Sequence, residues 1–214
     1  PGVHVAPFPY ATQGASVASA LQQVRLLLKQ QSAPCDTAAM LIEPVLGEGG
    51  YVPAPPEFLQ ELRSICSEHG ILLVCDEVQA GFGRTGSMFA YEQSGIIPDI
   101  LVMAKGIASG FPLSGISSSR ELMKHQPVGS MGGTYAGNAV SCAAALATLD
   151  VFEKEKLLEN TLERGQQLLR GLQRLADRYP ILEVRGRGLM IGVEFDMNAV
   201  PEGTASTLCK LCVG

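Results

Sequence analysis

The apolar positions of the chain alternate between helical spacing and short continuous runs. Residues 17–30 space their apolar side chains three and four apart, which predicts an amphipathic helix, and residues 55–69 repeat this spacing before Gly70. Residues 38–43, 71–75 and 100–104 are short runs that are apolar at nearly every position. Such runs, separated by helices, are typical of a mostly parallel sheet that is covered on both faces. The pattern therefore predicts an α/β fold.

The second half of the chain has a different pattern. Small side chains crowd residues 138–152, which predicts a closely packed helix, and a charged amphipathic helix is expected over residues 155–179. Two short strands, broken by glycines, are expected between residues 181 and 195. We predict that residues 1–152 form part of a large α/β domain and that residues 153–214 begin a smaller α+β domain.

Composition narrows the class of protein. Of the 214 residues, 46% are hydrophobic and 17% are charged, against about 25% charged in an average soluble chain. The net charge of −5 and the apolar content exclude a disordered chain and give no basic surface for nucleic acid. No apolar run reaches the ~18 residues of a membrane span. We expect a soluble globular protein that binds neither nucleic acid nor membrane and buries surface against another subunit.

The six cysteines do not predict a disulfide framework. Their positions match no small secreted domain, which indicates a reducing compartment. Cys209 and Cys212 have the C-x-x-C spacing of redox and metal sites, but one such pair cannot complete a four-ligand zinc site. The three histidines are also far apart in the sequence. We therefore expect no metal site.

A glycine-rich segment, Gly81-Phe-Gly83-Arg-Thr-Gly86, fits the G-x-G-x-x-G pattern of dinucleotide-binding sites. That pattern has meaning only where it joins a strand directly to a helix and an acidic residue follows about 20 positions later. Here four residues separate it from the strand that ends near Asp76, and no clear helix start follows. A nicotinamide-dependent dehydrogenase is thus a weaker hypothesis than a glycine-rich loop at an active site.

Two polar residues, Asp76 and Lys105, each end an apolar run. Ligands of open α/β sheets bind beyond the carboxyl ends of the strands, so both side chains are expected there. From spacing alone, two interpretations remain open. The pair forms a buried ion pair, or it forms a pyridoxal 5'-phosphate (PLP) site in which the lysine makes a Schiff base and the aspartate pairs with the pyridine nitrogen.

Several further motifs occur in a fixed order around this pair. They are Glu43-Pro-Val-Leu-Gly-Glu-Gly-Gly50, Asp76-Glu-Val-Gln79, Gly81-Phe-Gly-Arg-Thr-Gly86, Pro98-Asp-Ile-Leu-Val-Met-Ala-Lys105-Gly, Pro112-Leu-Ser-Gly115 and Gly132-Gly-Thr134-Tyr-Ala-Gly-Asn138. In order and spacing the chain resembles the class III aminotransferases from about Pro7 to Phe195. The resemblance implies a fold-type I architecture, a three-layer sandwich around a mostly parallel sheet, with PLP as cofactor.

The resemblance also implies a role for individual residues. Lys105 would form the Schiff base with PLP and later carry the proton between substrate and cofactor, while Asp76 would pair with the pyridine nitrogen. Val78 would pack against the ring, and Gln79 would hydrogen-bond its phenolic oxygen. Thr134 would bind the cofactor phosphate of a neighbouring subunit, which implies a homodimer.

Glu43 resembles the glutamate that, in this family, pairs with an arginine near the C-terminus during the second half-reaction. Because Glu43 also ends an apolar run, it is expected to point at the same edge of the sheet as Asp76. The alternative is that its carboxylate only stabilises the loop that follows.

The motifs look most like those of 4-aminobutyrate aminotransferases. They imply ping-pong transfer of an amino group from a small-molecule ω-amino acid donor to a 2-oxo acid such as 2-oxoglutarate, with ornithine and acetylornithine as alternative donors. The family's phosphate-binding loop and late arginine have no counterpart in these residues, so the chain is expected to be roughly half of a larger subunit. A catalytically incomplete fragment that only folds or dimerises is the alternative. No targeting segment is recognised, and we expect a cytoplasmic protein, or a mitochondrial matrix protein if the source is eukaryotic.

Overall fold

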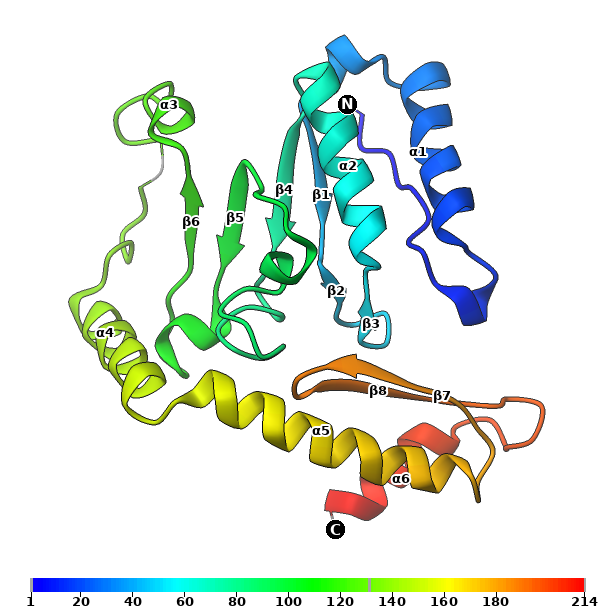
Figure 1. The fold of residues 1–214 in the computed structure, drawn as a ribbon. Coiled ribbons are helices and arrows are strands. Elements are labelled where there is room, and N and C mark those ends of the chain that lie inside the picture. Colours follow the sequence, from blue (N-terminus) through cyan, green and yellow to red (C-terminus); the bar gives the residue numbers. More distant parts are fainter. Residues whose placement is uncertain (1, 131, 214) are drawn as a thin grey trace.

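A computed structural model describes residues 2–130 and 132–213. Its main sheet has four strands in the order β1 (Ala39–Ile42), β4 (Leu72–Asp76), β5 (Ile100–Met103) and β6 (Gly115–Ser118) (Figure 1). The first three run parallel, and β6 pairs antiparallel with β5. The predicted α/β fold with a mostly parallel sheet is confirmed, although the antiparallel strand β6 had not been predicted.

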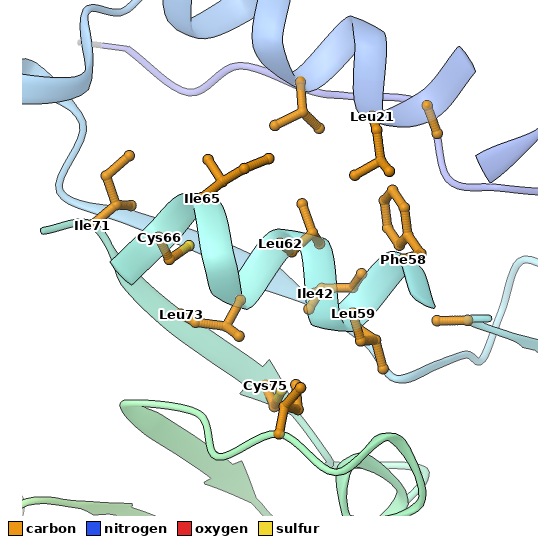
Figure 2. Close-up of a cluster of buried hydrophobic side chains, with 14 of the residues drawn as sticks. Leu21, Ile42, Phe58, Leu59, Leu62, Ile65, Cys66, Ile71, Leu73 and Cys75 are labelled. Atoms are coloured by element: carbon orange, nitrogen blue, oxygen red, sulfur yellow. The ribbon is translucent and has the colours of Figure 1, made fainter. Parts of the chain in front are cut away.

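Two helices cover one face of this sheet. Helix α1 (Val17–Gln30) begins where the Ser16 side chain accepts a hydrogen bond from the Ser19 amide, and α2 (Pro56–His69) ends at Gly70 in the left-handed region with φ 69°. Helix α2 packs against β4, and α1 packs against the other side of α2. Figure 2 shows side chains of α2 directed toward both neighbours. The labelled members of this core are Leu21, Ile42, Phe58, Leu59, Leu62, Ile65, Cys66, Ile71, Leu73 and Cys75.

The other face of the sheet is less covered. Side chains alternate between the two faces of a strand, so Leu41 points away from the core to which Ile42 contributes. Leu41 is 68% exposed, and Ile116 on β6 is 40% exposed. Coverage on both faces, and with it the three-layer arrangement, therefore stays a prediction.

Short elements join the main ones. The small hairpin of β2 (Val45–Leu46) and β3 (Val52–Pro53) follows β1 directly. A one-turn helix, α3 (Arg120–Met123), follows β6. The 3₁₀ turns are η1 (Ala11–Gln13), η2 (Pro34–Asp36), η3 (Ala90–Ser94) and η4 (Lys105–Ala108).

The C-terminal part consists of α4 (Ala139–Lys154), α5 (Leu157–Ala176), an antiparallel hairpin of β7 (Ile181–Arg187) and β8 (Met190–Phe195), and α6 (Thr204–Val213). In Figure 1 the long α5 runs beneath this hairpin. The two predicted helices and the two predicted strands are confirmed, and α6 had not been predicted. The boundary near residue 152 stays a prediction. In the described part of the chain no helix is long and apolar enough to cross a membrane.

Candidate active site

Three neighbouring parallel strands end at one edge of the sheet, and a predicted site residue comes at or just after each end. Ile42 on β1 pairs with Cys75 on β4, and Asp76 on β4 pairs with Val102 on β5. Glu43 follows Ile42, and Lys105 lies three residues beyond Val102. The expectation that these strand ends are neighbours is confirmed.

The carboxylate of Asp76 is oriented by its own loop. Its Oδ1 accepts a hydrogen bond from the amide of Val78 at 3.0 Å, a local turn typical of aspartate. This bond occupies one oxygen and leaves Oδ2 for another partner. Asp76 and Val78 are both half-buried, so the site combines a carboxylate and an apolar side chain at the end of β4.

Lys105 begins η4 in an unusual backbone conformation. Its φ is 46°, in the left-handed region that residues with a Cβ seldom adopt, and its side chain is exposed. The next residue, Gly106, is held against Phe82, because a Cβ at Gly106 would lie 2.8 Å from the Phe82 Cβ. The turn η4, which carries Lys105, therefore packs against the glycine-rich 81–86 segment.

A glutamate that the sequence patterns had not singled out contacts Gln79. The Gln79 Nε2 donates to Glu48 Oε1 at 2.9 Å. Gly47 packs against the same amide, since a Cβ at Gly47 would lie 2.8 Å from Nε2. Both partners belong to the 47–50 turn, which joins β2 to β3. The sequence signal for this contact was the glycine-rich Gly47-Glu-Gly-Gly50 segment, which contains both partners of Gln79.

Glu43 contacts the start of the same turn. Its Oε2 accepts a hydrogen bond from the Gly47 amide at 2.8 Å. This contact is the one expected of a carboxylate that stabilises the following loop. The pairing of Glu43 with a late arginine stays a prediction.

Glu77 is a second residue that sequence reasoning had missed. Its side chain is fully buried and accepts hydrogen bonds from the amides of Ala90 at 3.0 Å and Tyr91 at 2.8 Å. Burial raises the pKa of Glu77 to about 7, against the lowering effect of the two amides. The Glu77 amide also donates to the Val102 carbonyl. Glu77 thus ties η3 and β5 to the segment that carries Asp76 and Gln79.

Thr134 lies apart from the other predicted residues. It is exposed in the turn segment between α3 and α4, and no hydrogen bond within residues 2–130 and 132–213 links it to the other five. The helix that follows it, α4, packs against η4, the turn that begins with Lys105.

The glycines of the 81–86 segment are in contact with other parts of the protein. A Cβ at Gly83 would lie 2.7 Å from Phe152, and one at Gly86 would collide with Leu162. The segment is followed by the 3₁₀ turn η3 rather than by an α-helix. A dinucleotide site needs open space and a helix N-terminus at this place, so this structure contradicts the dehydrogenase hypothesis.

Comparison with known proteins identifies the family. The model of the class III aminotransferases matches residues 1–211. Among curated proteins, the chain is 49% identical over 194 residues to 5-aminovalerate aminotransferase of Pseudomonas putida, covering 90% of this chain and 46% of that protein. It is 48% identical over 193 residues to 4-aminobutyrate aminotransferase of Escherichia coli, covering 90% and 45%. The chain belongs to the class III aminotransferase family.

Solved structures agree with this assignment. An (S)-enantioselective omega-transaminase from Thermomicrobium roseum matches with a TM-score of 0.81 and 39% identity, over 90% of this chain and 45% of that one. The taurine:2-oxoglutarate aminotransferase of Bifidobacterium kashiwanohense, solved with PLP and glutamate, matches with a TM-score of 0.86 and 27% identity, over 96% and 51%. The chain therefore spans about half the length of the relatives it matches.

Class III aminotransferases use PLP, and the groups at the strand ends suit that cofactor chemically. Lys105 carries an exposed amine, the group that condenses with an aldehyde. A carboxylate for a pyridine N–H is supplied by Asp76 and an amide donor for a phenolic oxygen by Gln79. The residues present at this edge of the sheet thus fit the cofactor of the family.

Proposed function

We propose that the full-length protein transfers the terminal amino group of an ω-amino acid to a 2-oxo acid such as 2-oxoglutarate. The observation that carries this proposal is the placement of Lys105 and Asp76 after adjacent parallel strands, in a chain of the class III aminotransferase family. The relatives named for 5-aminovalerate and 4-aminobutyrate are 49% and 48% identical, against 40% for an ornithine aminotransferase of Staphylococcus saprophyticus. This difference favours a donor without an α-amino group, such as 4-aminobutyrate, over ornithine. Acetylornithine aminotransferases are 48% and 47% identical, but they match only 73% and 74% of this chain, against 90% for the first two relatives.

In this proposal Lys105 and Asp76 do the chemical work of the chain. The Lys105 amine would hold the cofactor through its aldehyde, and once released it would move a proton as a general base and acid. Asp76 keeps a proton on the pyridine nitrogen through its free oxygen, and its orientation is supported by the Val78 amide. When bound, PLP supplies the electron sink of the reaction.

Gln79 and Val78 hold the ring in this proposal. One N–H of the Gln79 amide is engaged by Glu48, so the second N–H is available for the phenolic oxygen. Val78 offers a half-buried apolar surface for one face of the ring.

We assign Glu43 to the loop rather than to the reaction. Its carboxylate is already engaged by the Gly47 amide, which supports the loop-stabilising alternative. The carboxylate of Glu48, by contrast, accepts a hydrogen bond from Gln79, which is a proposed cofactor ligand.

A second copy of the chain completes the site in this proposal. Thr134 is presented on the surface, as a ligand for a neighbouring subunit's phosphate requires. Large apolar side chains are exposed nearby, with Tyr135 at 84%, Val140 at 62% and Leu146 at 68%. Such an exposed apolar group is typical of a subunit interface. Sedimentation of the full-length protein should give a dimer, and a monomer that binds PLP normally would contradict this part.

The donor is tested with a panel of amines on the full-length protein. We expect 4-aminobutyrate and 5-aminovalerate to be used with 2-oxoglutarate in preference to ornithine and acetylornithine, and initial rates should follow ping-pong kinetics. A protein that transfers amino groups only from ornithine or acetylornithine would contradict the proposed donor.

One alternative is favoured by a specific observation. These 214 residues span about half the length of their relatives, and the alternative is that they form a catalytically incomplete fragment. The 214-residue chain is then expected to fold or dimerise without turnover. Measurable transamination by this chain alone would contradict that alternative.

A further inference from the structure

We propose that Arg185 is a positioning residue of the active site, acting through the 47–50 turn on Gln79. The inference rests on the proposed function, because it takes Gln79 to be a ligand of the cofactor. Arg185 lies on β7, in the C-terminal hairpin, 106 positions after Gln79 in the sequence. Its link to the site consists of contacts that can be followed one at a time.

The first contact joins the hairpin to the turn. The Arg185 side chain is only 9% exposed, and its Nε and Nη2 donate to the Gly50 carbonyl at 3.2 and 2.9 Å. The same carbonyl lies against Gly192 on β8, where a Cβ would stand 2.5 Å from the oxygen. The end of the 47–50 turn is therefore held between a guanidinium and a position that admits only glycine.

The guanidinium is itself held rigidly. Its Nη1 donates to Glu194 at 2.6 Å and to Glu183 at 2.7 Å, and it stacks over the ring of Tyr10 at 4.9 Å. Glu194 also accepts from Tyr10, Thr12 and Gln13 of the N-terminal segment. Burial disfavours the charged form, but hydrogen bonds to the two glutamates outweigh it and raise the pKa of Arg185. These contacts fix the charged guanidinium of Arg185 in the position from which it binds the Gly50 carbonyl.

The turn then transmits this position to Gln79. Its amides at Gly50 and Tyr51 donate to the Gly47 carbonyl at 3.1 and 3.2 Å, and Glu43 holds the Gly47 amide at the other end. Within this closed turn, Glu48 accepts from the Gln79 Nε2 and Gly47 packs on the same amide. Moving Gly50 therefore moves both groups that orient the Gln79 side chain.

The variants are chosen to separate this role from general stability. Arg185→Lys keeps the charge but loses the planar guanidinium. Gly192→Ala keeps Arg185 and pushes the Gly50 carbonyl away, since the added Cβ would lie 2.5 Å from that oxygen but at an ordinary contact of 3.5 Å from the Arg185 Nε. Arg174→Lys makes the same change at an exposed position of α5 and is the matched control. All three are made in the protein at its full natural length.

The first measurement is hydrogen exchange in the cofactor-free protein. We expect the peptide over residues 44–52 to exchange about tenfold faster or more in Arg185→Lys and in Gly192→Ala, with the helix at 17–30 unchanged. Arg174→Lys should match the parent protein. Unchanged exchange of the turn, or acceleration that is equal in the helix, would overturn the inference.

The second measurement is the pH midpoint of the visible absorbance of the PLP-loaded protein. A hydrogen bond donated to an oxygen anion lowers the pKa of the group that titrates with it, so a misplaced Gln79 should raise the midpoint by about half a pH unit or more. Arg185→Lys and Gln79→Ala should each raise it, and the double variant should show no further rise. An unchanged midpoint in Arg185→Lys, or fully additive shifts, would overturn the inference.

These outcomes are distinct from a failure of the proposed function. A parent protein without visible absorbance would contradict the proposed function itself, and the exchange of the 44–52 peptide would then decide alone whether Arg185 holds the turn. An unchanged midpoint in Gln79→Ala would remove Gln79 from the cofactor site and overturn the inference with it.

Discussion

At the scale of single residues, the backbone of Lys105 is the most unusual feature of the site. A left-handed conformation costs a residue with a Cβ about 1 kcal/mol relative to glycine. We therefore expect Lys105→Gly to have a free energy of unfolding about 1 kcal/mol higher than Lys105→Ala, measured by denaturant unfolding.

Lys124 offers the matched control for this comparison. It is exposed and its φ is −66°, so alanine should be at least as stable as glycine there. Equal stability of Lys105→Gly and Lys105→Ala would contradict the strained conformation at the site.

The buried carboxyl of Glu77 leads to a prediction about pH. Because its pKa rises from 4.5 in the unfolded chain to about 7 in the folded protein, the folded state binds more protons between these values. The stabilisation is fully present below pH ~4.5 and is lost as pH rises through about 7. At about 1.36 kcal/mol per pH unit, the loss is on the order of 3 kcal/mol.

The test compares the unfolding free energy of the parent and Glu77→Gln between pH 4.5 and 7.5. The unfolding free energy should fall less with rising pH in Glu77→Gln than in the parent, by on the order of 3 kcal/mol, because glutamine does not titrate. Glu68→Gln, at an exposed position of α2, should keep the pH dependence of the parent. Parallel curves for the parent and Glu77→Gln would show that Glu77 titrates alike in the folded and unfolded states, which would contradict the raised pKa.

Sequence reasoning reached Asp76, Gln79 and Lys105 because each stands at the end of an apolar run or inside a motif. It could not find Glu77, since nothing in a one-dimensional pattern marks which of two adjacent acids turns inward. The Glu48 contact was missed for a similar reason, because it joins residues 31 positions apart in sequence through two loops.

At the scale of elements, the fit of α5 beneath the hairpin rests on one glycine. A Cβ at Gly165 would collide with the Gly188 carbonyl, while a Cβ at Gly171 on the same helix would meet nothing within 4 Å. Gly171→Ala should therefore raise the free energy of unfolding by about 0.5–1 kcal/mol, as expected for alanine in a helix.

Gly165→Ala should lower the unfolding free energy instead, because the helix and the hairpin must separate. Thermal or denaturant unfolding of the two variants measures the contrast directly. Stabilisation by both alanines would contradict the close approach of α5 to the hairpin.

The long elements were predictable and the short ones were not. Residues 17–30 and 56–69 have apolar periodicity over whole turns, and Gly70 marks the end of the second, so both helices were predicted within a residue or two. Strand β6 is only Gly115–Ser118, and half of its residues are serines. Its antiparallel pairing with β5 is decided by tertiary contacts that leave no periodic signal.

At the scale of the whole molecule, the described chain brings the strand ends of the sheet, the 47–50 turn and the C-terminal hairpin together. The contacts of Arg185 with Gly50 cross 135 positions of sequence, and those of Glu194 with Tyr10 cross 184. Contacts of this separation could not be predicted from one sequence. The family could be predicted, because its motifs occur in the same order in this chain.

The central claim is that Lys105 and Asp76 form the PLP site of an aminotransferase, and one measurement tests it most directly. PLP is added to the protein at its full natural length, and the visible absorbance is recorded before and after borohydride reduction, followed by peptide mapping. We expect a visible band that is lost in Lys105→Ala, weakened cofactor binding in Asp76→Ala, and a reduced adduct on Lys105. A band that persists in Lys105→Ala, with the adduct on another lysine, would contradict the assignment of Lys105 to the PLP site.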